Sequence, residues 1–151
     1  MQVIGKVVKA AALAVSVALA TVPAASLAQK AADVIVYKCS FNHPPPHSAI
    51  VGPLFLELNQ KTGKARVFDP VIKYQVGKPL AAKVLANSDR RLTVRWIIHE
   101  AKGTLDGKPW RFPGLSHDMS IFKPGNKLML VTRSHAADNS YSANGQCVLQ
   151  H

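Results

Sequence analysis

Hydrophobic and polar residues alternate with a period of two over much of the chain after residue 33. The clearest run is RLTVRWII (91–98), where Leu92, Val94, Trp96 and Ile98 alternate with Arg91, Thr93, Arg95 and Ile97. Successive side chains on a β-strand point to opposite faces, so this run predicts a strand with one buried face and one solvated face.

Similar runs recur along the chain, separated by turn signals such as Gly63, Asp106-Gly107 and Pro124-Gly125. They occupy 34–41, 53–59, 64–69, 81–86, 117–122, 127–133 and 146–150, with a polar loop over 134–145. Residues 81–86 also suit a short helix, because Ala, Leu and Lys are good helix formers. The pattern predicts an all-β fold, a small antiparallel meander of seven to eight strands that closes into a barrel or sandwich.

The first 28 residues have a different pattern. Lys6 and Lys9 precede an uncharged apolar run over 10–22, and Ser26-Leu27-Ala28 supplies small residues at a cleavage position. This is typical of a secretory signal peptide, and a run of this length is short for a membrane span of about 20 residues. An uncleaved anchor helix is the alternative. We expect a single domain over 29–151, without a transmembrane segment, in the periplasm or outside the cell.

Two cysteines, Cys39 and Cys147, lie near the two ends of this domain. An even cysteine count in an exported protein predicts a disulfide. Such a bridge would join the first strand to the last, which form the seam of a closing barrel. Two buried free thiols are the alternative.

Positive charge dominates the domain. Without Lys6 and Lys9, 17 Lys and Arg residues face 8 Asp and Glu residues, a net charge of +9. This excess predicts attraction to polyanions, and we expect an anionic polymer or lipid surface rather than nucleic acid as the partner. The alternative is that the charge serves solubility alone.

Two groups of basic residues are candidates for anion binding. Arg66, Arg91 and Arg95 occupy polar positions of their strands and would form a stripe if those strands were neighbours. Lys108, Trp110 and Arg111 follow the Asp106-Gly107 turn as a basic and aromatic loop, and arginine beside aromatic rings suits anionic or aromatic ligands. The alternative is a solvated face with a tryptophan that covers one end of the barrel.

Metal and catalytic motifs are weak. His43 and His47 bracket three prolines, but polyproline II geometry separates them by about 12 Å and points them about 120° apart. We therefore expect a rigid loop there, although either histidine could join a metal site with distant residues. In Ser116-His117-Asp118, neighbouring side chains on a strand diverge, whereas a catalytic triad converges. We expect no catalytic residue, cofactor or metal.

Tyr37-Lys38-Cys39 with a late cysteine is similar to small periplasmic β-barrel inhibitors of lysozyme. The Ser-Gly and Tyr loop that such inhibitors insert into the enzyme is not found in this sequence, so no family is assigned. We expect an exported, monomeric, non-enzymatic protein that binds anionic components of the cell envelope. The alternative is a proteinaceous inhibitor of a secreted or periplasmic enzyme, and a hydrolase with a site built from distant residues is a third hypothesis.

Overall fold

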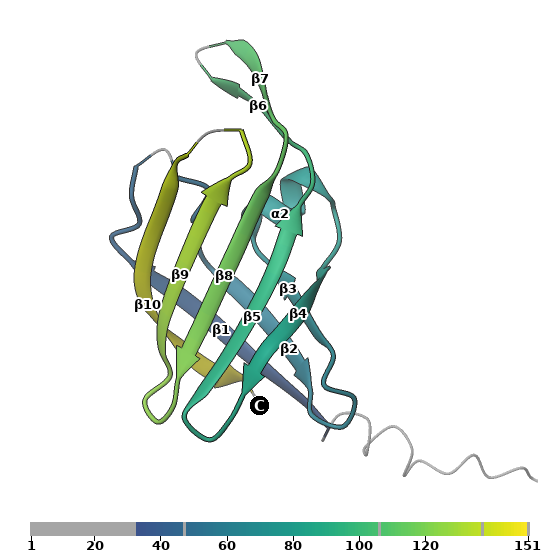
Figure 1. The fold of residues 1–151 in the computed structure, drawn as a ribbon, viewed down its shortest axis with the longest axis vertical. Coiled ribbons are helices and arrows are strands. Elements are labelled where there is room, and N and C mark those ends of the chain that lie inside the picture. Colours follow the sequence, from purple (N-terminus) through teal and green to yellow (C-terminus); the bar gives the residue numbers. More distant parts are fainter. Residues whose placement is uncertain (1–32, 47, 106, 137, 151) are drawn as a thin grey trace, which may run out of the picture.

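The computed structural model describes residues 33–46, 48–105, 107–136 and 138–150, and it shows a closed eight-stranded antiparallel barrel (Figure 1). The predicted signal peptide lies outside the described residues. The barrel strands are β1 (Val34–Asn42), β2 (Leu54–Asn59), β3 (Ala65–Phe68), β4 (Leu80–Asn87), β5 (Arg91–Ile98), β8 (Leu115–Phe122), β9 (Lys127–Ser134) and β10 (Ser140–Gln150). The predicted all-β meander is confirmed, and it closes as a barrel rather than a sandwich.

Each barrel strand pairs with the next one along the chain, and β1 pairs with β10 to close the barrel. A hairpin of β6 (Ala101–Leu105) and β7 (Lys108–Phe112) interrupts this order between β5 and β8. Strands β5 and β8 still pair directly, with Trp96 opposite His117. Figure 1 shows the hairpin projecting beyond the barrel. The hairpin is therefore an insertion that leaves the barrel complete.

The inward side chains follow the predicted alternation. In β5, residues Leu92, Val94, Trp96 and Ile98 are buried, and the residues between them face outward. The same holds for Leu54, Leu56 and Leu58 in β2. These side chains fill the barrel as one hydrophobic core.

The predicted disulfide is present. Cys39 and Cys147 lie directly opposite each other in the β1–β10 pair and are joined by a bond that spans 108 positions of the sequence. Both side chains face the interior and are fully buried. The bond therefore joins the first and last strands at the seam where the sheet closes.

Four elements differ from the sequence predictions. Strands β6 and β7 occupy a segment for which the sequence predicted a turn and a loop. Strand β10 begins at Ser140, so part of the predicted 134–145 loop is strand. A helix, α2 (Pro70–Gln75), was not predicted. Asp69 caps it by accepting a hydrogen bond from the Ile72 amide, 2.7 Å away, and Pro70 occupies its first turn. Asp followed by Pro is a known helix start, but the short helix has too few residues to show a helical period.

The meander gives the barrel two distinct ends (Figure 1). The helix end carries α2, the β6–β7 hairpin and the long β1–β2 loop, which includes His43 and the prolines. The turn end carries three short connections, over 60–64, 88–90 and 123–126. No helix within the described residues is long and apolar enough to cross a membrane.

Candidate functional site

The predicted arginine stripe does not form. Arg66 lies on β3, whereas Arg91 and Arg95 lie on β5, and β4 separates these two strands. All three side chains are exposed on the outside of the barrel. The alternation placed them on the correct face, but the neighbouring strands that a stripe requires are absent.

Two of the three arginines are held by carboxylates. Arg66 lies directly opposite Glu57 and donates to Glu57 Oε2, with a distance of 3.0 Å from Nε. Arg95 lies directly opposite Asp118 and donates to both of its oxygens, at 2.6 Å and 3.0 Å. Arg133 Nη1 also donates to Asp118 Oδ2, at 2.6 Å. The hydrogen bond from Arg95, supported by Arg133, lowers the pKa of Asp118.

The predicted basic and aromatic loop is strand β7 of the projecting hairpin. Lys108 and Arg111 are exposed, and the side chain of Trp110 lies outside the described part of the structure. Glu100 forms ion pairs with Arg111, at 3.3 Å, and with Lys102, at 3.2 Å. Here too a carboxylate neutralises part of the predicted site.

The hairpin is tied to the helix end by one side chain. Gln75, at the end of α2, accepts a hydrogen bond from the Lys102 amide at 2.8 Å and donates back to the Lys102 carbonyl. The Gln75 side-chain amide thus satisfies the backbone N–H and C=O of Lys102, as a neighbouring strand would. This contact fixes the base of the hairpin, while Lys108 lies near its tip.

Basic side chains that form no ion pair with any described residue collect at the turn end. Six basic side chains lie on or beside its three short connections, against two acidic ones, Asp33 and Asp89. The six are Lys61, Lys64, Arg90, Arg91, Lys123 and Lys127. None of them forms an ion pair with another described residue. We define the turn-end cluster as these six residues.

Beside this cluster, one aromatic side chain lies between two of its cations. Phe122 on β8 is directly opposite Arg91 on β5 and directly opposite Lys127 on β9. All three are exposed on the outer face. Side chains directly opposite in an antiparallel pair have Cβ atoms about 5 Å apart. The sheet therefore holds a row of cation, ring and cation at fixed spacing.

Hydrogen bonds between two turns make this region rigid. The Lys123 amide donates to the Arg90 carbonyl at 2.8 Å. Lys123 Nζ donates to the Ser88 carbonyl at 3.1 Å, and Ser88 Oγ accepts from the Arg91 amide at 3.1 Å. The 88–90 and 123–126 connections thus hold each other, and the cations on them share one frame.

Sequence reasoning found Arg91 but missed the other members as a group. The segment Phe122-Lys123-Pro124-Gly125-Asn126-Lys127 places two lysines and an exposed ring around one turn, and that local signal was available. The position of Arg91 beside Phe122 could not be predicted, because the inserted hairpin separates β5 from β8 in the sequence.

The barrel interior holds a smaller polar group near the helix end. His117 is buried, stacks on Trp96, and its Nδ1 lies 2.9 Å from Thr132 Oγ1. Burial lowers the pKa of His117 to about 4. Asp118 follows in the chain but points outward to its arginines, so the Ser116-His117-Asp118 side chains diverge as predicted. Among the described residues, no group of three or more His, Cys, Asp or Glu could hold a metal ion; His47 lies outside them.

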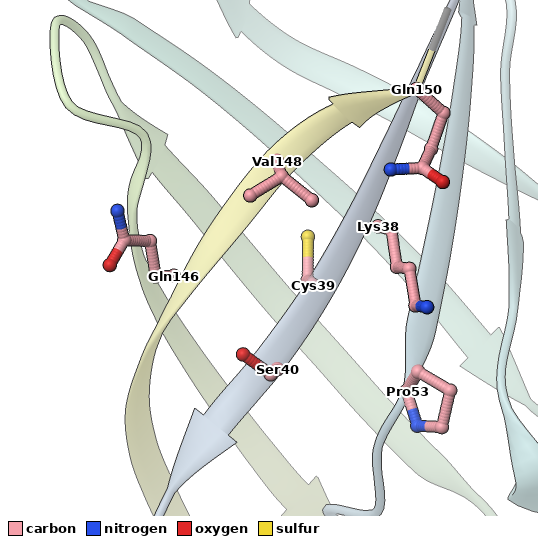
Figure 2. Close-up of a pocket in the computed structure, with 7 residues that line it drawn as sticks. All are labelled: Lys38, Cys39, Ser40, Pro53, Gln146, Val148 and Gln150. Carbon is pink, nitrogen blue, oxygen red and sulfur yellow. The ribbon is translucent and has the colours of Figure 1, made fainter.

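A shallow depression crosses the seam on the outside of the barrel, above the disulfide (Figure 2). Its lining residues are Lys38, Cys39, Ser40, Pro53, Gln146, Val148 and Gln150. It contains a single cation and no carboxylate, so it offers little charge to a ligand. The turn-end cluster is the stronger candidate site.

Comparison of the chain with protein-family models, with curated proteins and with solved structures finds no significant match.

Proposed function

We propose that the protein is an exported, non-enzymatic binding protein that recognises an anionic component of the cell envelope through its turn-end cluster. The observation that carries the proposal is the concentration, at one end of the barrel, of six basic side chains that have no ion pair within the described part of the chain. The signal-peptide pattern over 1–28 supports export, and a disulfide suits an oxidising compartment.

Ion pairing favours the turn end, which carries six basic side chains without an ion pair among the described residues, whereas the helix end carries three, Lys73, Lys78 and Lys108. A guanidinium already held by a carboxylate, as in Arg66 with Glu57, offers less charge to a second anion because its partner must be displaced. The turn-end cations have no such competitor among the described residues. Multiple weak contacts on a rigid frame can then act together, with release of counterions from the polyanion.

A matched pair of triple variants tests this proposal. Arg90→Gln, Arg91→Gln and Lys127→Gln remove three charges from the turn end, whereas Lys73→Gln, Lys78→Gln and Lys108→Gln remove three from the helix end. On a heparin column, we expect the first variant to elute at clearly lower salt, with affinity reduced about tenfold or more at about 50 mM salt. The second variant should elute close to the wild type.

Three results would contradict the proposal. Equal losses in both variants would mean that binding follows net charge without a site. A larger loss in the helix-end variant would assign binding to the hairpin. A wild type that does not bind at low salt would exclude polyanion binding altogether.

The hairpin favours a second candidate function. It projects from the barrel and is anchored at its base by Gln75 (Figure 1), which is a shape suited to entering the cleft of another protein. This geometry supports inhibition of a secreted or periplasmic enzyme. Such an inhibitor should form a complex of fixed stoichiometry that survives about 200 mM salt, unlike polyanion binding, and replacement of residues 102–111 by a short linker should abolish that complex.

A further inference from the structure

We infer that the turn end docks onto the surface of a membrane that contains anionic lipids, rather than onto a soluble polyanion. The inference rests on the proposed function and goes further, because it assigns a role to apolar side chains beside the cations. Phe122 is 39% exposed and Met129 is 40% exposed, although both lie on strands whose inner faces are fully packed.

These two side chains belong to one continuous surface. Met129 lies two residues after Lys127 on β9, on the same outer face, at about 7 Å along the strand. Phe122 lies directly opposite Lys127 on the neighbouring strand. Leu85, at the bulge in β4, is also exposed, but Thr93 and Ser120 lie between it and Met129 across the sheet. We define the apolar ridge as Phe122 and Met129.

The apolar ridge runs along the edge of the turn-end cluster. Arg91 and Lys127 flank Phe122 directly, and the 123–126 turn that follows Phe122 carries Lys123. A soluble polyanion would contact the cations and leave the ridge in water. A lipid surface contacts both, because its headgroups take the cations and its outer acyl region takes the apolar side chains.

The positive charge of the turn-end cluster suits an anionic membrane surface. Basic residues near an anionic leaflet are attracted by its negative surface potential, and the effect fades within a Debye length of about 10 Å. The 88–90 and 123–126 connections hold each other through the Lys123 and Arg90 backbones. The cations and the ring therefore reach a flat surface together without rearrangement.

The helix end also carries exposed apolar and basic side chains, so it serves as a control for the composition of the turn end. Tyr74 and Val76 are exposed there, 74% and 36% respectively, and Lys73 and Lys78 flank them. This second patch has the same kinds of residues but lies at the opposite end of the barrel. A general attraction between lipids and any exposed basic and apolar residues would involve both patches equally.

The test is flotation of the disulfide-bonded protein with vesicles of phosphatidylcholine alone or with about 30% phosphatidylglycerol, beside heparin chromatography. We expect the wild type to bind only the anionic vesicles. Phe122→Ser with Met129→Ser should bind those vesicles about tenfold more weakly, because less apolar area is buried, while its elution from heparin stays unchanged. Phe122→Leu with Met129→Leu should restore vesicle binding, and Tyr74→Ser with Val76→Ser should leave it intact.

The outcomes separate this inference from the proposed function. If the wild type binds neither vesicles nor heparin, both fall. If it binds heparin and the serine variant still binds vesicles normally, the membrane inference falls and the polyanion proposal stands. If the serine variant loses affinity for vesicles and for heparin equally, the inference is also overturned, because the substitutions would then disturb the fold rather than a membrane contact. Loss of vesicle binding in the helix-end variant would move the docking surface to α2.

Discussion

Trp96 and His117 stack inside the barrel with ring centroids 4.8 Å apart and ring planes 8° from parallel. They lie directly opposite each other on β5 and β8. His117 Nδ1 pairs with Thr132 Oγ1, whereas His117 Nε2 and Trp96 Nε1 have no partner among the described residues. A proton added to this imidazole would place a charge in a buried site that cannot solvate it.

We therefore predict that His117 stays neutral in the folded protein until the pH approaches 4. Burial lowers its pKa to about 4, although the nearby Asp118 charge opposes that shift. The check is an NMR titration of the histidine ring signals. A midpoint near 6.5, the ordinary value for histidine, would show that water reaches the ring.

The same shift predicts a loss of stability in acid. Because the folded pKa of His117 lies below the unfolded value of about 6.5, the unfolded chain takes up the proton first as the pH falls. The free energy of unfolding should then decrease between about pH 6.5 and pH 4, by about 3 kcal/mol from this group. His117→Phe, which retains an aromatic ring and cannot titrate, should lack this contribution in denaturant titrations across that range.

Asp69 should oppose this effect over nearly the same range. Burial raises its pKa to about 6, while backbone hydrogen bonds from Ile72 and Val71 pull it down. Because the folded pKa is above the unfolded value, the folded state gains the proton first, and stability increases as the pH falls from about 6 to 4. This contribution is also about 3 kcal/mol.

The variant Asp69→Asn should separate the two groups. Asparagine is as good a helix N-cap as aspartate, so α2 should remain, but the compensation between pH 6 and 4 disappears. We expect the unfolding free energy of this variant to fall more steeply with acid than that of the wild type. Parallel curves for the two proteins would show that the Asp69 carboxyl titrates at its ordinary pKa.

Gly145 is needed for closure of the barrel. It lies opposite Phe41 in the β1–β10 pair, and a Cβ atom added there would overlap the Ser40 carbonyl oxygen and lie 3.0 Å from the Phe41 Cα. Backbone cannot move aside as a side chain can, so Gly145→Ala should destabilise the fold by about 3 kcal/mol. Asn144→Ala, at the exposed neighbouring position, should change stability by less than about 0.5 kcal/mol. Similar unfolding midpoints for the two variants would contradict this account of the seam.

The disulfide should stabilise the barrel strongly and resist reduction. Replacing Cys39 and Cys147 by alanine removes a cross-link over 108 positions, which should lower the unfolding free energy by about 4 to 5 kcal/mol. Because both sulfur atoms are buried, alkylation after mild reductant should be slow without denaturant and fast with it. Rapid alkylation of the native protein would show that the seam opens readily.

Much of the fold could be predicted because it depends on local alternation. The period of two in residues 91–98 reproduces β5 with its correct inner face, and the cysteine positions indicated which strands close the barrel. The exceptions are also local in origin. Helix α2 is too short for a helical period, and residues 140–145 carry polar outward positions that resemble a loop.

The candidate site was harder to predict because it depends on which strands are neighbours. Alternation placed Arg66, Arg91 and Arg95 on the outer face, but the predicted meander itself puts the strand over 81–86 between those of Arg66 and Arg91, so a stripe was not compatible with that order. Nor could alternation show that Glu57 and Asp118 face Arg66 and Arg95 across the sheet. The position of Phe122 between two cations likewise depends on pairing across an inserted hairpin.

The seam also has a consequence for how the chain folds. Every other pairing in the barrel joins strands that follow one another around the meander, so those contacts can form as successive hairpins. Only β1 and β10 must find each other across nearly the whole domain, and the entropy of closing that long loop opposes their encounter. A chain that enters folding with Cys39 and Cys147 already joined has completed its slowest search, so oxidation before folding should accelerate barrel formation as well as stabilise the result.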